Sequence, residues 1–423
     1  MAKDRVVAGI DVGSSKVCTI ITTVSQEGSV HVIGVSTVPS KGLKKGQIVD
    51  IEDAVSAINA GLESAERMAG FAISSAFISV GGAHINCQNS RGVVAVAEPE
   101  SEIALTDVDR VIEAAKAITL PSSREIVHVL PRGYIVDSQE GIRDPVGMTG
   151  VRLEVETHII TGSTTSMRNL AKCVQEVGVD VESLIFGGVA SSEAVLSDTE
   201  KELGVVLVDI GGGTTDVCLF IEGALAFSAV IPIGAKHITN DVAIGLRVSL
   251  DTAEKIKLSL SKEPRIIATE EGKTRKDIPS DEFDITALGV TEEARKFSRK
   301  TLIEGIIRPR LSEIFSLVAM EIKRSGFGGM TPSGVVVTGG GAETIGVSEI
   351  TRHVLSMPVR IGYPQGVTGL IDEIQGPAFS TSVGLVLYGA KGEGLGSVGL
   401  SEMNLPGKDL LKRLVTFVRS FLP

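Results

Sequence analysis

Tryptophan is absent from this 423-residue sequence, and cysteine and histidine are scarce, at four and six residues. The cysteines, Cys18, Cys87, Cys173 and Cys218, lie far apart and form neither a C-x-x-C pair nor the spacing of a zinc site. We therefore expect reduced thiols in the core of a cytoplasmic protein. No H-E-x-x-H pattern occurs, which argues against a transition-metal site.

Excess positive charge and long apolar runs are lacking as well. The net charge is −11 and the pI is about 5.2, and no basic stripe stands out in the body of the chain, so we expect no nucleic-acid partner. No uncharged apolar run reaches the roughly 18 residues of a membrane span, and the N-terminus lacks the apolar segment of a secretory signal. With 43% hydrophobic residues, the chain can instead form two or more subdomains with sizeable cores.

The most informative stretch is a glycine-rich turn between two apolar runs at residues 205–217, VVLVDIGGGTTDV. Glycines let backbone N–H groups approach an anion, and threonine hydroxyls add further donors. The pattern predicts a phosphate-binding hairpin, with Asp209 at the end of the first strand placed to hold a hydrated Mg²⁺. Taken alone, the stretch is also typical of a plain hairpin between two core strands.

Two further stretches follow the same scheme. Residues 6–16, VVAGIDVGSSK, again run from an apolar strand through Asp11 into glycine and hydroxyls, and residues 335–342, VVVTGGGA, offer a backbone surface suited to a sugar or adenine. Three such stretches in this order suggest two related halves closing on one nucleotide. Neither G-x-x-x-x-G-K-[ST] nor a complete G-x-G-x-x-G is present, which argues against P-loop and dinucleotide-binding folds.

These stretches resemble the two phosphate motifs and the adenosine motif of the actin-like ATPase superfamily, which includes actin, Hsp70 chaperones and sugar kinases. The resemblance implies an α/β actin-like ATPase fold, with two related halves around a nucleotide cleft that binds ATP and Mg²⁺. The A-E-x-x-K pattern at 253–257 matches superfamily residues that contact ribose and adenine, although Glu254 and Lys257 alone would be interpreted as a solvated ion pair.

The residues expected to bind the nucleotide share small or polar side chains in these motifs. They are Gly13, Ser14, Ser15, Lys16, Gly211, Gly212, Gly213, Thr214, Thr215, Gly234, Glu254, Lys257, Gly339, Gly340, Gly341 and Ala342. Asp11 and Asp209 are candidates for holding Mg²⁺ through water. Members that hydrolyse ATP well carry Glu or Gln at the start of the first connecting helix, where it orients the attacking water. The matching position here is Gly187, so we expect tight binding and at most a weak ATPase.

Residues 83–162 interrupt this plan and are expected to form a small α+β module. We expect a strand over 85–96, a helix over 106–118 capped by Thr106, strands over 125–131 and 134–137, and a last strand over 151–161. Within this region, residues 107–118, 124–137 and 141–162 closely resemble the insert of the bacterial cell-division family FtsA. Actin, Hsp70 chaperones and MreB lack this module at that place.

The FtsA resemblance implies a protein that self-associates, binds the C-terminal tail of the tubulin-like polymer FtsZ, and contacts other division proteins through the insert. The tail would bind the second small subdomain, where Arg295, Arg299 and Lys300 form a basic cluster. This cluster lies in a stretch expected to be helical over 292–324, with a break or a new start at Pro309. Without the resemblance, such a cluster is simply a solvated helix face. The implied location is the cytoplasmic side of the cell membrane at the division site.

In the last sixteen residues, 408–423, the apolar and the polar side chains fall on opposite sides of a helical wheel with no mixing. The apolar arc holds Leu410, Leu411, Leu414, Val415, Phe417, Val418, Phe421 and Leu422, and the polar side includes Lys412, Arg413 and Arg419. This pattern predicts an amphipathic helix lying on an anionic membrane surface. A final helix docked on the domain would show similar separation, but the glycine-rich tether before it favours the membrane.

The expected division of the chain follows from these motifs. Subdomain 1A takes residues 1–82 with 163–200 and 372–390, inserted subdomain 1C takes 83–162, subdomain 2A takes 201–230 with 303–371, subdomain 2B takes 231–302, and a flexible linker, 391–407, precedes the helix 408–423. Two other functions stay open. A PilM-like pilus assembly ATP-binding protein would share the fold and the position of the insert but not the terminal helix. An Hsp70-like or sugar-kinase-like ATPase would need a substrate domain or sugar pocket.

Overall fold

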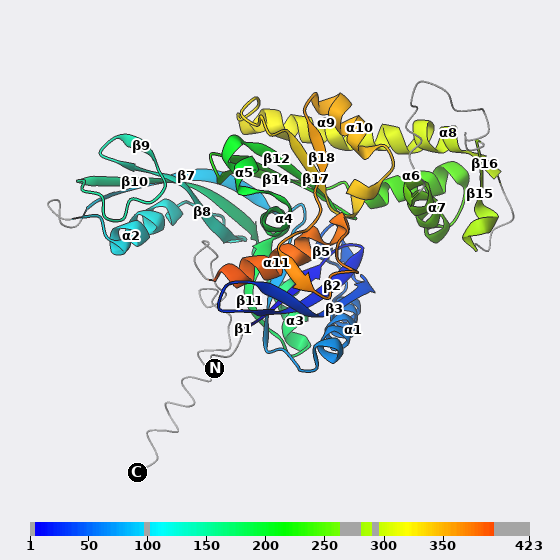
Figure 1. Cartoon of the computed structure of the whole chain (residues 1–423), viewed down its shortest axis with the longest axis horizontal. Helices are drawn as coiled ribbons and strands as arrows, with labels where there is room; N and C mark the ends of the chain where they lie inside the picture. The colour runs from blue at the N-terminus through cyan, green and yellow to red at the C-terminus, as the bar shows by residue number, and fades with distance from the viewer. Residues whose placement is uncertain (1–4, 97–101, 263–280, 290–295, 393–423) are drawn as a thin grey trace, which may run out of the picture.

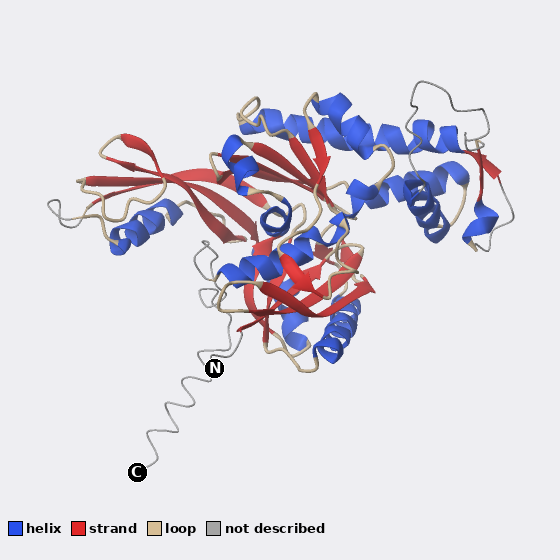
Figure 2. Ribbon diagram, viewed as in Figure 1, coloured by secondary structure: helices blue, strands red, loops and turns tan. Residues whose placement is uncertain are grey.

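Two β-sheets form the two lobes of the molecule in the computed structural model, which describes residues 5–96, 102–262, 281–289 and 296–392 (Figures 1 and 2). The sheet of lobe I has six strands in the order β11-β6-β1-β2-β3-β19. These strands are β1 (Arg5–Val12), β2 (Lys16–Val24), β3 (Val30–Pro39), β6 (Ser75–Val80), β11 (Asp180–Phe186) and β19 (Val367–Gly369). The helices of this lobe are α1 (Ile51–Ala69), α3 (Thr164–Glu176) and α11 (Ser380–Lys391).

Lobe II repeats the same plan around five strands in the order β14-β13-β12-β17-β18. The strands are β12 (Val205–Ile210), β13 (Thr215–Ile221), β14 (Ala224–Ile231), β17 (Val335–Thr338) and β18 (Val359–Ile361), and the helices are α4 (Gly187–Val195), α5 (Asp198–Leu203), α9 (Arg308–Ser325) and α10 (Val347–Leu355). In each lobe an apolar strand ending in aspartate turns back antiparallel, so that Asp11 pairs with Cys18 and Asp209 with Asp216. The expectation of two related α/β halves is confirmed.

Helix α1 shows how local sequence sets the bounds of an element. Its apolar positions recur at helical spacing and bury Ala54, Ile58 and Leu62 against the lobe I sheet. The carboxylate of Asp50 accepts the backbone N–H of Asp53, as expected for an N-cap, and Gly70 ends the helix in the left-handed conformation.

The inserted module is a four-stranded sheet, in the order β7-β10-β8-β9, with one helix packed on it. Its elements are β7 (Asn86–Ala95), α2 (Leu105–Lys116), β8 (Arg124–Val136), β9 (Gln139–Ile142) and β10 (Arg152–Ser163). Two expectations about it were wrong. The two runs at 125–131 and 134–137 form the single strand β8, and α2 is capped at Ala104, not at Thr106. Asp107 stands at the third helical position, and its carboxylate accepts the Ala104 N–H at 3.2 Å.

The insert docks on the edge strand of the lobe II sheet, although its chain branches from lobe I. Cys87 Sγ donates to the Ser228 carbonyl at 2.7 Å, and the Asn89 side-chain amide donates to the Ala226 carbonyl at 3.3 Å. His158 of β10 lies between the two parts, with Nδ1 at 2.7 Å from Asn89 Oδ1 and Nε2 at 2.9 Å from the Ser228 hydroxyl. The insert therefore covers the β14 edge, which would otherwise present unpaired backbone groups.

This buried histidine predicts an acid-dependent loss of stability. Burial, with smaller effects from Arg132 and His128, lowers the pKa of His158 to about 3, while the unfolded chain titrates near 6.5. Since the unfolded state binds the proton first, His158 contributes its full stability above about pH 6.5 and loses it progressively as the pH falls toward 3. We expect the free energy of unfolding from urea titrations to be higher for the parent chain than for His158→Gln at pH 7.5, and this difference to shrink by about 2 kcal/mol at pH 5. Both proteins share all other titratable groups, so the effects of those groups cancel in the comparison. A difference in unfolding free energy that does not change with pH would contradict the prediction.

A second small subdomain projects from lobe II on the side opposite the insert (Figure 1). Its described elements are α6 (Ala235–Leu246), α7 (Leu250–Lys262), β15 (Glu282–Asp284), β16 (Lys296–Ser298) and α8 (Arg299–Leu302), followed by a π-helical turn, Ile303–Ile307. The expectation that residues 292–324 are helical, with a break or a new start at Pro309, is wrong at its beginning: residues 296–298 are a strand, and the helical run begins at Arg299. Pro309 falls in the first turn of α9, directly after the π-helical turn, whose backbone is already helical. The change from π to α hydrogen bonding at this point agrees with the break or new start expected at Pro309.

Three smaller features complete the fold. Strand β19, inside the stretch 303–371 expected for subdomain 2A, pairs with β3 of lobe I through Val367 and Val30. Short hairpin strands, β4 (Leu43–Lys44) and β5 (Gln47–Ile48), precede α1. All four cysteines are free thiols.

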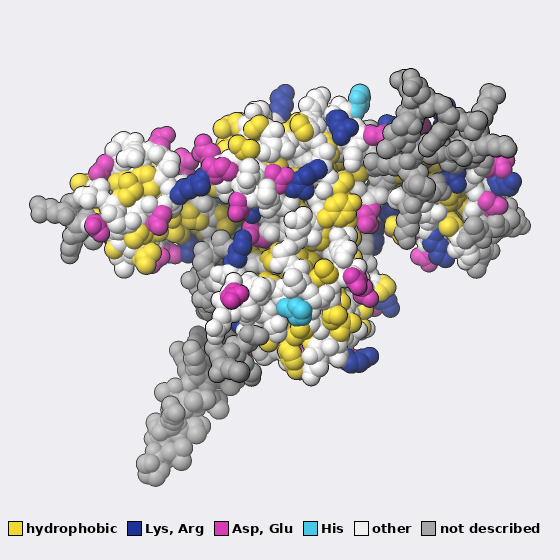
Figure 3. Space-filling model, viewed as in Figure 1, with side chains coloured by type: hydrophobic (Ala, Val, Ile, Leu, Met, Phe, Trp, Pro, Cys, Tyr) yellow, Lys and Arg dark blue, Asp and Glu magenta, His cyan; other side chains and the backbone are white. Residues whose placement is uncertain are grey.

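Basic and acidic side chains are interspersed over both lobes on the face shown in Figure 3. Arg360 of β18 and Glu200 of α5 form one such pair, with both guanidinium–carboxylate distances at or below 2.7 Å. No helix in the described part of the chain is both long and apolar enough to cross a membrane. The expected tether beyond residue 392 and the amphipathic helix 408–423 lie outside the described residues.

Candidate functional site

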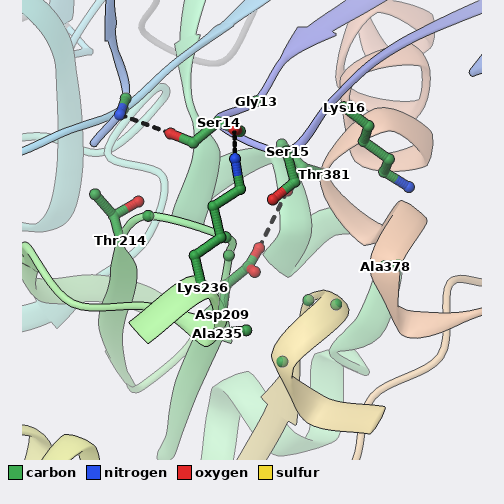
Figure 4. A pocket seen from close by; sticks show the side chains of 18 of the residues that line it. Gly13, Ser14, Ser15, Lys16, Asp209, Thr214, Ala235, Lys236, Ala378 and Thr381 are labelled. Carbon is green, nitrogen blue, oxygen red and sulfur yellow. Dashed lines mark hydrogen bonds between the residues drawn. The ribbon is translucent and has the colours of Figure 1, made fainter. Parts of the chain in front are cut away.

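A cavity of about 760 Å³ lies between the two lobes. Its walls come from the β1–β2 loop of lobe I, the β12–β13 turn of lobe II, the first turn of α6, one face of α7, the glycines after β17, and the start of α11 (Figure 4). The three glycine-rich stretches singled out in the sequence thus meet around one space.

The β1–β2 loop and the β12–β13 turn lie directly against each other. Both are closed in the same way, by Gly13 N–H donating to the Lys16 carbonyl and by Gly211 N–H donating to the Thr214 carbonyl. A Cβ added at Gly212 would lie 2.0 Å from Ser15 Oγ. A side chain at Gly212 would force Ser15 to move, so glycine here allows the close approach of the two turns, and residues of both turns line the same cavity.

A lysine of lobe II reaches across to the β1–β2 loop of lobe I. The Lys236 ammonium, at the start of α6, donates to the Ser14 carbonyl at 2.6 Å, and the Gly46 N–H donates to Ser14 Oγ at 2.9 Å (Figure 4). The described lobes are therefore held in contact at the rim of the cavity.

Three carboxylates from the two strand turns gather at the base of the cavity. Burial raises the pKa of Asp209 to about 6 and raises that of Asp11. Burial, and then the Asp209 and Asp11 carboxylates, raise the pKa of Asp216 well above its ordinary value. Among the described residues, none forms a hydrogen bond with Asp216 Oδ1, which is buried. No cluster of three or more acidic, histidine or cysteine side chains within the described ranges forms a metal site by itself. Buried acids with an unsatisfied oxygen fit a divalent cation that is held through water, and its charge would reduce their mutual repulsion.

The Lys16 ammonium is a buried cation without a hydrogen-bond partner among the described residues. It lies 3.1 Å from the centroid of the Phe379 ring, and burial lowers its pKa. In Figure 4 its side chain extends toward Ala378, away from Asp209. A buried ammonium of this kind is suited to an anionic ligand in the cavity.

Helix α7 presents a face with both polar and apolar side chains to the cavity. Lys257, which is 6% exposed, donates to Glu254 Oε2 at 2.8 Å and to Thr239 Oγ1 at 3.1 Å. Leu250 and Leu258 also line the cavity and are 58% and 41% exposed. Polar groups flanked by apolar side chains fit a ligand with a sugar hydroxyl and a flat ring. The sequence analysis missed the two leucines, although positions 250, 254, 257 and 258 share one helical face.

The glycines after β17 differ in what they allow. Gly339 has φ +79° and a Cβ there would lie 2.2 Å from Asp209 Oδ1, so this glycine is required by both conformation and space. Gly340, in contrast, would meet only Ala378, at 3.7 Å. The first glycine shapes the fold and the second leaves the cavity wall open.

Most of the nucleotide residues expected from sequence line this cavity, as do Asp11 and Asp209. Thr215, Gly234 and Ala342 do not: they lie behind the wall, where Thr215 Oγ1 donates to the Ile233 carbonyl and Gly234 begins α6 against the Gly211 carbonyl. Lining residues that the sequence analysis missed include Ser79, Lys236, Thr239, Asp251, Glu343 and Thr381. They stand outside the three motifs and share no common spacing with them.

Gly187 begins α4, the position at which a glutamate or glutamine is expected in strong hydrolases. A Cβ at Gly187 would lie 3.0 Å from Asp216 Oδ2, so this part of the wall carries no side chain of its own.

The basic cluster expected to bind a partner is only partly described. Arg299 lies over the Phe283 ring at 5.1 Å, and the Lys300 backbone N–H donates to Asp281. Arg295 lies outside the described residues.

Solved structures with a similar arrangement define the class of protein. The chain resembles the PilM-PilN type IV pilus biogenesis complex (TM-score 0.64, 14% identity, 91% of this chain and 98% of that chain) and the ethanolamine utilization protein EutJ from Carboxydothermus hydrogenoformans (0.52, 17%, 92% and 91%). It also resembles MreB5 of Spiroplasma citri bound to ADP (0.50, 14%, 89% and 94%). Together with the two related lobes and their central cavity, these neighbours identify an actin-like ATPase fold.

Sequence comparison narrows this class to one family. Residues 82–161 match the family model for the SHS2 domain inserted in FtsA, and residues 206–384 match that for cell division protein FtsA. The chain is 40% identical over 419 residues to FtsA of Pseudomonas aeruginosa, covering 97% of each, and 37% identical over 396 residues to FtsA of Escherichia coli K12, covering 92% of this chain and 91% of the relative. The chain belongs to the FtsA family of cell division proteins.

Proposed function

We propose that this FtsA-family protein binds ATP and Mg²⁺ between its lobes, self-associates, and tethers FtsZ filaments to the cytoplasmic side of the cell membrane at the division site. The observation that carries the nucleotide part is the cavity itself. Two glycine turns lie against each other across the lobes. The cavity also holds the buried Lys16 ammonium, which has no hydrogen-bond partner among the described residues, and the interacting carboxylates of Asp11, Asp209 and Asp216.

The phosphates of ATP are assigned to the backbone N–H groups and hydroxyls of residues 13–15 and 211–214, with Lys16 and Lys236 as cationic partners. Mg²⁺ would supply the positive charge that neutralises the phosphates and the carboxylates of Asp11 and Asp209. Adenosine is assigned to the space between Gly340 and the α7 face with Glu254, Lys257 and the two leucines. The ADP named for the MreB5 structure supports a nucleotide in this fold.

Slow turnover follows from the wall at Gly187, which has no side chain to orient a water molecule. A long-lived bound nucleotide would keep both lobes fixed, and fixed lobes favour head-to-tail self-association. As part of this proposal we keep subdomains 1A, 1C, 2A and 2B, with residues 391–407 as tether, but we move strand β19 from 2A to 1A because it pairs with β3.

Attachment to the membrane is assigned to residues 408–423, and the FtsZ tail to the subdomain that carries Arg299 and Lys300. A single short amphipathic helix binds lipid reversibly, so firm attachment needs many copies in one polymer. Contacts to further division proteins are assigned to the insert.

The likeness to PilM is one of fold at 14% identity, whereas 40% identity to FtsA over nearly the whole chain favours cell division over pilus assembly.

Co-sedimentation with anionic lipid vesicles tests this function. With Mg²⁺ and ATP, we expect the full chain to bring FtsZ filaments down with the vesicles, and FtsZ lacking its C-terminal tail to stay in the supernatant. The chain truncated after residue 407 is the matched control, and it should bind FtsZ but leave it free of lipid. Equal recovery of FtsZ with and without residues 408–423 would refute the tethering function.

A further inference from the structure

Two neighbouring hydroxyl residues in the first turn of α11 contact the aspartates of both lobes. Thr381 Oγ1 donates to Asp209 Oδ2 at 3.1 Å, and Ser382 Oγ donates to Asp11 Oδ2 at 3.2 Å. Figure 4 shows the first of these contacts. We call Thr381 and Ser382 the hydroxyl pair.

The hydroxyl pair comes from a part of the chain far from either aspartate. Asp11 is the next-to-last residue of β1 in lobe I, and Asp209 is the next-to-last residue of β12 in lobe II. Consecutive residues of one helix turn therefore hold carboxylates from opposite sides of the cavity. A rigid helix turn fixes the distance between its own two hydroxyls. Through them it also fixes how the two carboxylates face each other.

Each bond leaves oxygen atoms available on the carboxylates. The other oxygen of Asp11 accepts from Ser79 Oγ at 2.7 Å, and Ser79 in turn accepts the Val12 N–H at 3.0 Å, so Asp11 is oriented from two directions. A carboxylate oxygen has more than one lone pair and can accept a hydroxyl while it faces a hydrated cation. Outer hydrogen-bond partners of this kind set the orientation of metal-holding groups and affect metal affinity.

We propose that Thr381 and Ser382 are positioning residues for the divalent cation: they hold Asp11 and Asp209 at the mutual geometry that the hydrated ion requires. They thereby link occupancy of the ion to the orientation of α11. This inference rests on the proposed binding of Mg²⁺ and ATP.

The test measures ATP affinity by calorimetry over a series of Mg²⁺ concentrations, with thermal unfolding of the nucleotide-free protein as a second readout. We expect Thr381→Val and Ser382→Ala each to raise the Mg²⁺ concentration needed for half-maximal enhancement of ATP affinity by about tenfold or more. Affinity for ATP measured in excess chelator should stay within about twofold of the parent chain. Thr381→Ser, which keeps the hydroxyl, should restore the parent midpoint.

The neighbouring residue Ser380 provides the matched control. It lies in the same turn, is fully buried, and bonds to the Thr338 hydroxyl at 2.6 Å and the Pro377 carbonyl at 3.0 Å, not to either aspartate. Ser380→Ala should lower the unfolding temperature and leave the Mg²⁺ midpoint unchanged. If the hydroxyl-pair variants behave like Ser380→Ala, the inference is overturned while ATP binding stands. If the parent chain itself shows no uptake of ATP with Mg²⁺, the proposed function fails instead.

Discussion

A Gly384→Ala variant is expected to lose on the order of 3 kcal/mol of folding free energy or more, and to accumulate as insoluble protein when expressed warm. Gly384 lies in α11 where this helix crosses α4, and an added Cβ would stand 1.8 Å from the Ala190 carbonyl oxygen. The obstacle is backbone, which cannot rotate away as a side-chain end could. The two helices would have to move apart, and they connect the lobes. Urea unfolding followed by far-ultraviolet circular dichroism measures the loss.

Gly61 in α1 is the matched control for this prediction. It is also a helical glycine in the lobe I core, but a Cβ there would make only ordinary contacts, at 3.5 Å or more, with Thr19, Val38 and Val17. Since alanine favours a helix over glycine, Gly61→Ala should be neutral or stabilising by up to about 1 kcal/mol. If both variants lost the same stability, helix crossing would not be the cause.

Gly339→Ala is expected to abolish measurable ATP binding, with a drop of at least a hundredfold in affinity, and to destabilise lobe II. A side chain at φ +79° is strained, and the Cβ would stand 2.2 Å from Asp209 Oδ1 and 2.6 Å from the Ile210 carbonyl. The Asp209 carboxylate would be displaced from the base of the cavity. Calorimetry with ATP and Mg²⁺ gives the affinity, and thermal unfolding without nucleotide gives the stability.

The adjacent Gly340 separates the two effects. Its Cβ would meet only Ala378 at ordinary contact distance, so Gly340→Ala should unfold at the parent temperature. Because its methyl group would project from the cavity wall, it should still lower ATP affinity by a smaller factor. Parent-like ATP affinity in Gly339→Ala would contradict the assignment of this wall to the ligand.

Much of the fold could be predicted because the glycine motifs mark strand ends. Asp11 and Asp209 each lie near the end of an apolar strand, and the loops that follow meet in the structure because related halves place equivalent loops face to face. The bounds of α1 were predictable for a local reason, since Asp50 and Gly70 are strong caps.

Other features depend on contacts that no short sequence window contains. Strand β19 is three residues long and exists because β3 offers it an edge. Thr381 reaches the cavity only because α11 crosses between the lobes, and Leu250 and Leu258 are exposed although their residue type suggests a core. The start of α2 was misjudged because aspartate at the third position can close a cap on a residue without a polar side chain, here Ala104.

The docking of the insert on β14 has a mechanical consequence for the whole molecule. The start of the insert, at Cys87 and Asn89, is bonded to Ser228 and Ala226 of lobe II. The same module is held to lobe I, where His128 of β8 accepts the Phe186 N–H and Val127 packs in the lobe I core. Any rotation that separates the lobes must therefore break the contacts of the insert with one of them, so the insert resists opening of the central cavity.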